Sequence, residues 1–203
     1  MFKKKIIVFE GIEGSGKSYH LNKVCNYLRK KKIKFIKFRE PGGHHNSEKI
    51  RNLILNNKSN FNKNTDLLLY LAARSENIEL IKKYMQSRVI LIDRFVDSTI
   101  AYQHYGMGVN LNLIKIINKI LMRGVKIDFT FLNLVNNKNM KLRLAKRKNL
   151  NRYDKFNYNF YNKVQKGFIK ISKQNPKKYM HINSNLQINI NKNIIINKIS
   201  KLI

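Results

Sequence analysis

The chain has 203 residues, and its 42 lysines and arginines against 11 aspartates and glutamates give a net charge of +31. Such a charge is typical of nucleic-acid-binding proteins, but the lysines are spread among many asparagines and isoleucines, so the coding bias of an A/T-rich genome explains the excess and no specific nucleic-acid binding is expected. The single cysteine, Cys25, excludes an internal disulfide framework, and because no apolar stretch is long enough to cross a membrane, a cytoplasmic protein without membrane contact is expected.

The first half of the chain predicts two strands and three helices. Residues 6–9 form a short apolar run typical of a buried strand, and apolar residues recur at helical spacing over residues 21–28. The remaining elements of this half are a strand over residues 33–38, a helix over 47–55, and a long helix over 65–84 that Thr65 or Asp66 is expected to cap.

The second half continues the alternation of strands and helices. We expect a strand over residues 88–93, helices over 96–105 and 111–122, a strand over 128–134, helices over 140–148 and 153–171, a strand over 179–182 and a final helix. This order predicts an α/β fold in which a doubly wound, five-stranded parallel sheet is flanked by helices. Because no linker rich in proline, glycine and serine interrupts it, residues 1–203 are expected to form a single domain.

A glycine-rich loop separates the first predicted strand from the first predicted helix. Gly11–Ser18 fits the pattern G-x-x-x-x-G-K-[ST], and strand, loop and helix follow one another as a phosphate-binding loop requires. The glycines let backbone N–H groups turn toward phosphate oxygens, while Lys17 is expected to reach the β- and γ-phosphates and the Ser18 hydroxyl to ligate Mg²⁺. A P-loop NTPase-like fold is therefore expected, with a nucleotide phosphate bound by Gly11, Ile12, Glu13, Gly14, Ser15, Gly16, Lys17 and Ser18.

Polar residues follow the third predicted strand, at the sheet edge where the phosphate loop also lies. Asp93 suits Mg²⁺, bound directly or through water, and Arg94 suits a phosphate, with an ordinary surface turn as the alternative. On the next helix Ser98 and Tyr102 share a face directed back toward the strand end. At that position Tyr102 and Gln103 could line the site of a sugar or base, although the pattern alone also fits ordinary helix surface.

Arginine is distributed differently from lysine. In a chain whose composition favours lysine, a retained arginine indicates a need for its planar, bidentate guanidinium group. The arginines that fall in or beside the motifs are Arg39, Arg51, Arg74, Arg94, Arg143, Arg147 and Arg152.

Together these motifs resemble the thymidylate kinase family of P-loop nucleoside-monophosphate kinases, over essentially the whole chain. The matching segments are Phe9–Ser18 with F-E-G-x-[DE]-G-x-G-K-[ST], Arg39–Gly43 with R-E-P-G-G, Leu69–Arg74 with L-[FY]-x-A-x-R, and Asp93–Gln103 with D-R-[FY]-x-x-S-x-x-A-Y-Q. The resemblance implies that ATP and dTMP react to give ADP and dTDP for dTTP synthesis, with Mg²⁺ as cofactor, in a homodimer.

The resemblance also implies roles for individual residues. Tyr70 would stack on thymine, Arg74 would reach a thymine carbonyl or the monophosphate, and Arg94 would hold the dTMP phosphate. Glu13 would orient the acceptor sugar or the metal ion. The dTMP-binding residues implied are Glu40, Pro41, Tyr70, Arg74, Arg94, Ser98, Thr99, Tyr102 and Gln103.

A lid is expected to supply a catalytic arginine. Some family members carry an arginine inside the phosphate loop, but here Ser15 stands in front of Gly16, so the resemblance implies the bacterial type with a lid arginine. The short lid is expected at about residues 138–152, with Arg147 and Arg152 as candidates for the transition-state contact and Arg143 as a weaker one. A solvated basic helix end is the alternative.

Two other functions remain open at this stage. Another P-loop nucleoside-monophosphate or deoxynucleoside kinase would share the fold and the loop, and a basic nucleic-acid-binding P-loop protein would share the charge. The preference for dTMP over dUMP, the dimer interface and the exact set of Mg²⁺ ligands beyond Ser18 and Asp93 do not follow from the sequence.

Overall fold

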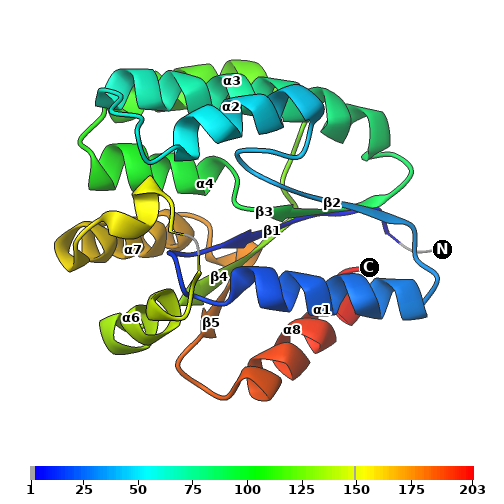
Figure 1. The fold of residues 1–203 in the computed structure, drawn as a ribbon. Coiled ribbons are helices and arrows are strands. Elements are labelled where there is room, and N and C mark those ends of the chain that lie inside the picture. The colour runs from blue at the N-terminus through cyan, green and yellow to red at the C-terminus, as the bar shows by residue number, and fades with distance from the viewer. Residues whose placement is uncertain (1–2, 149) are drawn as a thin grey trace.

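Five strands form one parallel sheet at the centre of the computed structural model, which describes residues 3–148 and 150–203 (Figure 1). The strands are β1 (Ile6–Glu10), β2 (Phe35–Arg39), β3 (Val89–Asp93), β4 (Phe129–Leu134) and β5 (Tyr179–Asn183). Their order across the sheet is β2-β3-β1-β4-β5, and all neighbours pair in parallel. Because β1 lies in the middle and is buried along its whole length, its first four residues form a continuous apolar run, which ends at the buried Glu10. The predicted doubly wound α/β fold is confirmed.

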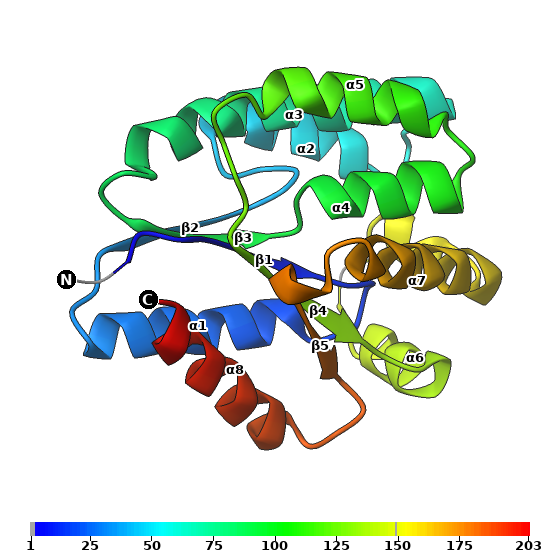
Figure 2. The ribbon, with the colours of Figure 1, turned by 180° about the vertical axis from the view of Figure 1, so that it is seen from behind.

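Helices cover both faces of this sheet. On one face lie α1 (Lys17–Lys30) and α8 (Ile188–Leu202), which pack on the side chains of Ile7 and Phe9 (Figure 1). On the other face α3 (Lys63–Tyr84) packs on Val8 and Ile90. The outer helices of that face are α2 (His45–Leu55) and α5 (Leu111–Leu121), which lie beside α3 in Figure 2. Alternate residues of β1 therefore face two separate apolar cores, as a buried parallel strand requires.

The helix that follows β3 changes its winding after one turn. The structure has α4 (Val96–Thr99) and then a π-helix over Ile100–Gly106, where one α-helix over 96–105 was predicted. Such π turns within helices are frequent at functional sites. Two residues of this segment, Tyr102 and Gln103, line the pocket described below.

The segment around residue 153 differs from the prediction of one helix over residues 153–171. A 3₁₀ turn (Arg152–Lys155) comes first, and α7 (Tyr158–Lys173) begins only after Asn157, whose side chain accepts a hydrogen bond from the Phe160 N–H at 2.9 Å. The preceding helix is α6 (Asn137–Ala145), and a short 3₁₀ turn (Pro176–Lys178) leads into β5.

The cap of α3 also differs from the prediction. Asn62, not Thr65 or Asp66, accepts hydrogen bonds from the N–H groups of Asn64 and Thr65, both at 3.0 Å. Asparagine is among the strongest N-cap residues, so it begins the helix two residues early. The Asp66 side chain is thereby left free to turn inward, where it is buried. Within the described residues, no helix combines the length and the apolar character that crossing a membrane requires.

Candidate active site

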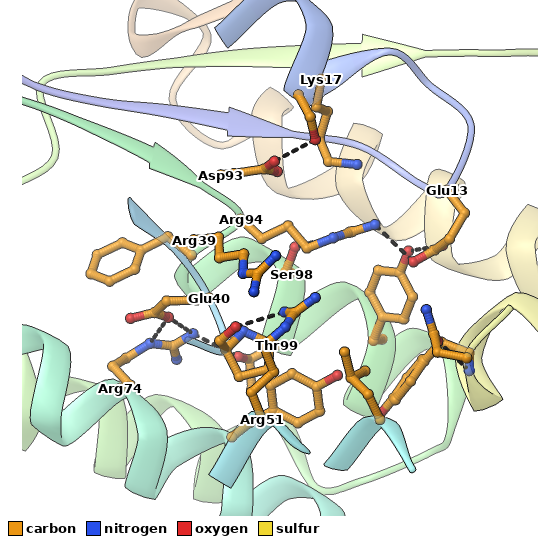
Figure 3. A pocket seen from close by; sticks show the side chains of 18 of the residues that line it. Glu13, Lys17, Arg39, Glu40, Arg51, Arg74, Asp93, Arg94, Ser98 and Thr99 are labelled. Atoms are coloured by element: carbon orange, nitrogen blue, oxygen red, sulfur yellow. Dashed lines mark hydrogen bonds and ion pairs between the residues drawn. The ribbon is translucent and has the colours of Figure 1, made fainter. Parts of the chain in front are cut away.

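One pocket lies at the carboxyl ends of β1, β2 and β3, where ligands bind in open parallel sheets (Figure 3). It brings together most of the predicted site residues. The predicted residues that line it are Glu13, Lys17, Ser18, Glu40, Pro41, Tyr70, Arg74, Asp93, Arg94, Ser98, Thr99, Tyr102, Gln103 and Arg147. The other members of Gly11–Ser18 belong to the loop that borders it, and Arg152 is not in its wall.

The phosphate loop depends on glycine at both of its ends. Gly11 has φ +137°, and a Cβ atom there would lie 2.3 Å from the Asn133 backbone oxygen, so no other residue fits against the end of β4. Gly16 has φ +84° and is the N-cap of α1. Because the first turn of α1 contains no acidic side chain, its N–H groups and positive dipole end are left for an anion.

Lys17 is a buried cation held by the loop itself. Its ammonium group donates to the Ile12 carbonyl oxygen at 3.0 Å and lies 3.5 Å from the Ser15 hydroxyl. Burial and the nearby Arg94 guanidinium lower the pKa of Lys17 to about 8, because both disfavour its charged form. A bound polyphosphate would supply the missing negative charge.

Ser18 and Asp93 meet beside this lysine. The Ser18 hydroxyl donates to a carboxylate oxygen of Asp93 at 2.6 Å, which joins the start of α1 to the end of β3. Oxygen ligands of this kind suit Mg²⁺, which keeps several waters and binds through one or two protein groups plus phosphates. Within the described part of the chain no cluster of three or more His, Cys, Asp or Glu residues could hold a metal alone. The pair therefore fits an ion that arrives with a nucleotide.

Arg94 links the phosphate loop to the rest of the pocket. Its guanidinium donates to the Gly11 carbonyl oxygen at 2.8 Å and forms an ion pair with Glu13, also at 2.8 Å. The second oxygen of Glu13 accepts a hydrogen bond from the Tyr102 hydroxyl. Burial raises the pKa of Tyr102, so the phenol stays neutral and remains a donor. Arg94, Glu13 and Tyr102 are therefore connected, and they are anchored to the phosphate loop through Glu13.

Glu10 holds the backbone on which Arg94 sits, a role that the sequence analysis missed. Arg94 has φ +66°, a conformation that costs energy for a residue with a side chain. The buried Glu10 carboxylate accepts from the Phe95 N–H at 2.7 Å and from the Ser98 hydroxyl at 2.6 Å, which fixes the turn from both sides. Burial and the nearby carboxylate of Asp97 raise the pKa of Glu10 to about 7.

Arg74 and Glu40 form a buried ion pair at the far end of the pocket. Their side chains are 1% and 4% exposed, and the Arg74 Nη2 atom lies 2.9 Å from Glu40 Oε2. Arg74 also donates to Asn118 at 2.7 Å and to Thr99 at 2.8 Å, so most of its donors are already engaged. Burial raises the pKa of Glu40, and the charge of Arg74 opposes that shift.

Aromatic side chains surround the same end. Tyr70 lines the pocket and meets the ring of Tyr153 edge to face, with 6.0 Å between ring centres. Tyr102 contacts Tyr153 in the same way at 5.9 Å. Gln103 also lines the pocket, is 1% exposed, and its Nε2 atom lies 3.4 Å from the Tyr153 hydroxyl. Flat apolar walls with one buried amide suit a planar ring that carries polar edges.

The three arginines around the predicted lid point to three different places. Arg147 lines the pocket and pairs with Asp154 at 2.5 Å. Arg152 forms an ion pair with Asp66 of α3, and Arg143 donates to the backbone oxygens of Gly14 at 2.9 Å and Ser184 at 2.6 Å. Asn149, which belongs to the predicted lid, lies outside the described residues. Among the candidates, Arg147 is thus the one in the wall of the pocket.

Two further arginines that were not assigned to the site line the pocket. Arg39 and Arg51 reach into the space between Lys17 and Arg74 (Figure 3). Arg51 donates to the Pro41 carbonyl oxygen at 2.7 Å, and Arg39 pairs with Glu48 at 3.2 Å. Both belong to the arginines retained in a lysine-rich chain, and that signal could have identified them. The pocket wall also includes Leu55, Phe95, Asn151 and Tyr153.

Comparison with known proteins gives one consistent result. A family model described as thymidylate kinase matches residues 9–195. The thymidylate kinase of Thermoanaerobacter sp. (strain X514) is 32% identical over 202 residues, 98% of this chain and 98% of that protein. That of Thermosipho africanus (strain TCF52B) is 40% identical over 169 residues, 82% and 84% of the two chains. The crystal structure of thymidylate kinase from Ehrlichia chaffeensis has a TM-score of 0.78 at 31% identity and covers 98% of this chain and 99% of its own.

Proposed function

Because the chain belongs to the thymidylate kinase family, it transfers the γ-phosphoryl group of ATP to dTMP, and we propose that the pocket at the carboxyl ends of β1, β2 and β3 is where this transfer takes place. The observation that carries the assignment is Arg94, which is bonded to Gly11 and Glu13 of the phosphate loop and lines the same pocket as the buried Arg74–Glu40 pair. Donor and acceptor phosphates would meet at this arginine.

We assign the ATP phosphates to Gly11–Ser18. The left-handed glycines and the open N-terminus of α1 direct backbone N–H groups toward an anion, and Lys17 would turn from the Ile12 carbonyl to the β- and γ-phosphates. Ser18 and Asp93 would hold Mg²⁺, directly or through water, since their oxygens already lie 2.6 Å apart. The ion would supply charge neutralisation between the phosphates of the nucleotide.

We assign dTMP to the opposite end of the pocket. Arg94, with Arg39 and Arg51 beside it, would hold the monophosphate, and Tyr70 would cover one face of the base. Tyr102 would lie against the deoxyribose because its hydroxyl is held by Glu13. The remaining contacts are assigned to Glu40, Pro41, Arg74, Ser98, Thr99 and Gln103.

The chemistry then requires little proton transfer. Phosphoryl transfer depends on in-line positioning and on charge stabilisation, so the residues act by binding, by orientation and by their positive charge. Glu13 keeps Arg94 in place, and Arg147 is the lid residue that we assign to the transition-state charge, because it lines the pocket together with Lys17. Arg152 is instead held in an ion pair with Asp66.

The experiment that tests this assignment is an acceptor panel. ADP release from ATP and Mg²⁺ is followed by a coupled assay with dTMP, dUMP, AMP, GMP and CMP. We expect kcat/KM to be highest for dTMP. Preference for a purine monophosphate would show that the pocket has been assigned to the wrong acceptor.

We also propose that the enzyme is a homodimer and works in the cytoplasm. Three apolar side chains of α5 are exposed, with Leu113 at 42%, Ile116 at 59% and Ile120 at 68%, and α5 is an outer helix that lies beside α3 (Figure 2). Exposed apolar patches of this kind mark protein–protein interfaces. Sedimentation of the wild type and of Ile116→Lys/Ile120→Lys tests the dimer, since a dimeric variant would place the interface elsewhere.

A further inference from the structure

Asp66 is a buried carboxylate behind the base end of the pocket. It lies in the first turn of α3, its side chain is 2% exposed, and it does not line the pocket itself. Its oxygens accept hydrogen bonds from the Tyr153 hydroxyl and from the Arg152 guanidinium, and from the Gln103 amide nitrogen at 3.3 Å. Asp66 thus joins the π-helical segment after β3 to the 3₁₀ turn that begins at Arg152, the last residue of the predicted lid.

These bonds determine which end of the Gln103 amide faces the ligand. The Tyr153 hydroxyl gives its proton to Asp66, so its oxygen is left to accept from the Gln103 Nε2 atom at 3.4 Å. Both neighbours of that nitrogen are therefore acceptors, and the reversed amide would place oxygen against oxygen. The Gln103 Oε1 atom consequently faces the other way. It is buried and has no hydrogen-bond partner within the described residues.

A buried acceptor without a partner calls for a donor on the ligand. A pyrimidine ring offers two alternatives at its N3 position. Thymine and uracil carry an N3–H group that can donate to Gln103 Oε1, whereas cytosine carries a lone pair that would oppose it. This inference rests on the proposed function, because it takes the base to be the part of the ligand that lies beside Tyr70 and Gln103.

Arg152 connects this arrangement to the lid. Its guanidinium lies 5.5 Å from the centre of the Phe61 ring and 5.1 Å from the centre of the Tyr153 ring, and it forms an ion pair with the Asp66 carboxylate. The 3₁₀ turn over Arg152–Lys155 is in turn closed by Asn151 and Asp154, which cap it reciprocally. When this turn lies on α3, Tyr153 and Asp66 together hold the amide of Gln103.

We propose that Asp66 is a positioning residue for base selection. Its carboxylate holds Gln103 with the amide oxygen toward the acceptor pocket, and it is held there by Arg152, the last residue of the predicted lid, and by Tyr153, which follows it. The enzyme thereby rejects a cytosine nucleotide at N3. It gains no discrimination at this edge between thymine and uracil, which carry the same N3–H group.

The test is the substitution Asp66→Asn. An asparagine at 66 can donate as well as accept, so the Gln103 amide is free to turn over and to offer its NH₂ group to cytosine. We expect the ratio of kcat/KM for dTMP to kcat/KM for dCMP to fall about 10- to 100-fold, the size of effect produced when a buried polar group gains or loses a hydrogen-bond partner. The change should appear in KM for the acceptor, with KM for ATP little changed. The ratio of dTMP to dUMP should stay as in the wild type.

Three further variants separate this role from a structural one. Tyr153→Phe keeps the ring but removes the hydroxyl, and it should shift the dTMP/dCMP ratio in the same direction by less. Asp128→Asn, which removes the carboxylate paired with Lys5 at 2.8 Å far from the pocket, should leave the ratio unchanged. In a Gln103→Leu background, Asp66→Asn should cause no further change in the ratio, because Asp66 acts through that amide.

Calorimetric titration with dTMP and dCMP keeps the inference testable without turnover. If the wild type prefers dTMP in binding but transfers no phosphoryl group, the proposed function fails while the role of Asp66 can still be measured. An unchanged dTMP/dCMP ratio in folded Asp66→Asn, or in Tyr153→Phe if Asp66→Asn does not fold, would overturn the inference. So would a wild type that binds both nucleotides equally.

Discussion

The two ends of the pocket are built in different ways. The ATP end consists of consecutive residues, Gly11–Ser18, whose donors are mainly backbone N–H groups left open at the start of α1. The acceptor end takes its side chains from separate elements and pairs them with one another, as Arg74 does with Glu40 across 34 positions of the chain. The ATP end is thus completed by its ligand, whereas the acceptor end carries internal counter-charges before a ligand binds. Removing a side chain at the ATP end should therefore lower the rate of the reaction. Removing one at the acceptor end should lower the stability of the fold as well.

The largest expected effect is at the ATP end. Lys17→Met removes the buried ammonium group that would stabilise the negative charge on the transferred phosphoryl group. We therefore expect kcat to fall by about 10³-fold, the effect of removing one hydrogen-bond donor to a charged transition state. The free energy of unfolding should not fall, because a desolvated charge is removed from the folded chain. Coupled assays and urea titration measure the two quantities. A large loss of stability would mean that this end is also held by its side-chain pairs.

The next effect is at the acceptor end and concerns stability. Glu40→Gln leaves the Arg74 guanidinium buried without its counter-charge, and breaking a buried pair from one side costs about 3 kcal/mol or more. We expect a lower midpoint of urea denaturation with an unchanged slope. Lys5→Met, which breaks a partly exposed pair with Asp128, is the control and should cost less than about 1 kcal/mol. Equal losses in the two variants would remove the distinction between the ends.

Substitutions of Arg147 and Arg152 should change different kinetic constants. Arg147→Ala removes the lid arginine that lines the pocket and should lower kcat about 10²-fold or more with a modest change in KM for ATP. Arg152→Ala should instead raise KM for dTMP, because Arg152 is bound to Asp66 at the base end. Steady-state kinetics with each substrate varied in turn distinguishes them. An unchanged kcat in the double variant would show that neither supplies the transition-state charge.

The smallest effect is a pH dependence of the ATP end. Since the pKa of Lys17 in the free chain is lowered to about 8, the protonated form that binds phosphate is lost above that pH, and kcat/KM for ATP should fall about tenfold between pH 8.5 and 9.5. The sign for stability is opposite. Between pH 8 and the ordinary lysine pKa of 10.5 the unfolded chain holds more protons, so Lys17 makes stability rise with pH. Lys17→Met should abolish both trends.

The contrast between the ends also explains what the sequence could predict. The strand, the phosphate loop and α1 are consecutive, so their pattern was sufficient, and Asp93 and Arg94 followed from the rule that parallel strands end at one edge. The five-stranded fold was also predictable, because its strands and helices alternate as consecutive segments of the chain. Assignments of single residues to ATP or dTMP remain predictions that the experiments above test.

The residues that sequence reasoning missed act through distant partners. Glu10 is one residue of a matched motif, but its bonds to Phe95 and Ser98 span 85 and 88 positions. From the sequence Asp66 is predicted only to cap a helix, because nothing in the neighbouring residues shows that its partners are Gln103 and Arg152. The predicted helix start at residue 153 was wrong for a local reason. Asn157 caps α7, so the helix begins at Tyr158 although the apolar periodicity extends further toward the N-terminus.

The central claim is that one end of the pocket transfers phosphate and the other selects and holds dTMP. The most direct measurement is the fate of the label from γ-³²P-ATP with dTMP, in the wild type and in Lys17→Met, together with the Kd of each for dTMP. We predict labelled dTDP from the wild type, almost none from Lys17→Met, and the same Kd for both. Label released only as inorganic phosphate from the wild type, or loss of dTMP binding in Lys17→Met, would contradict it.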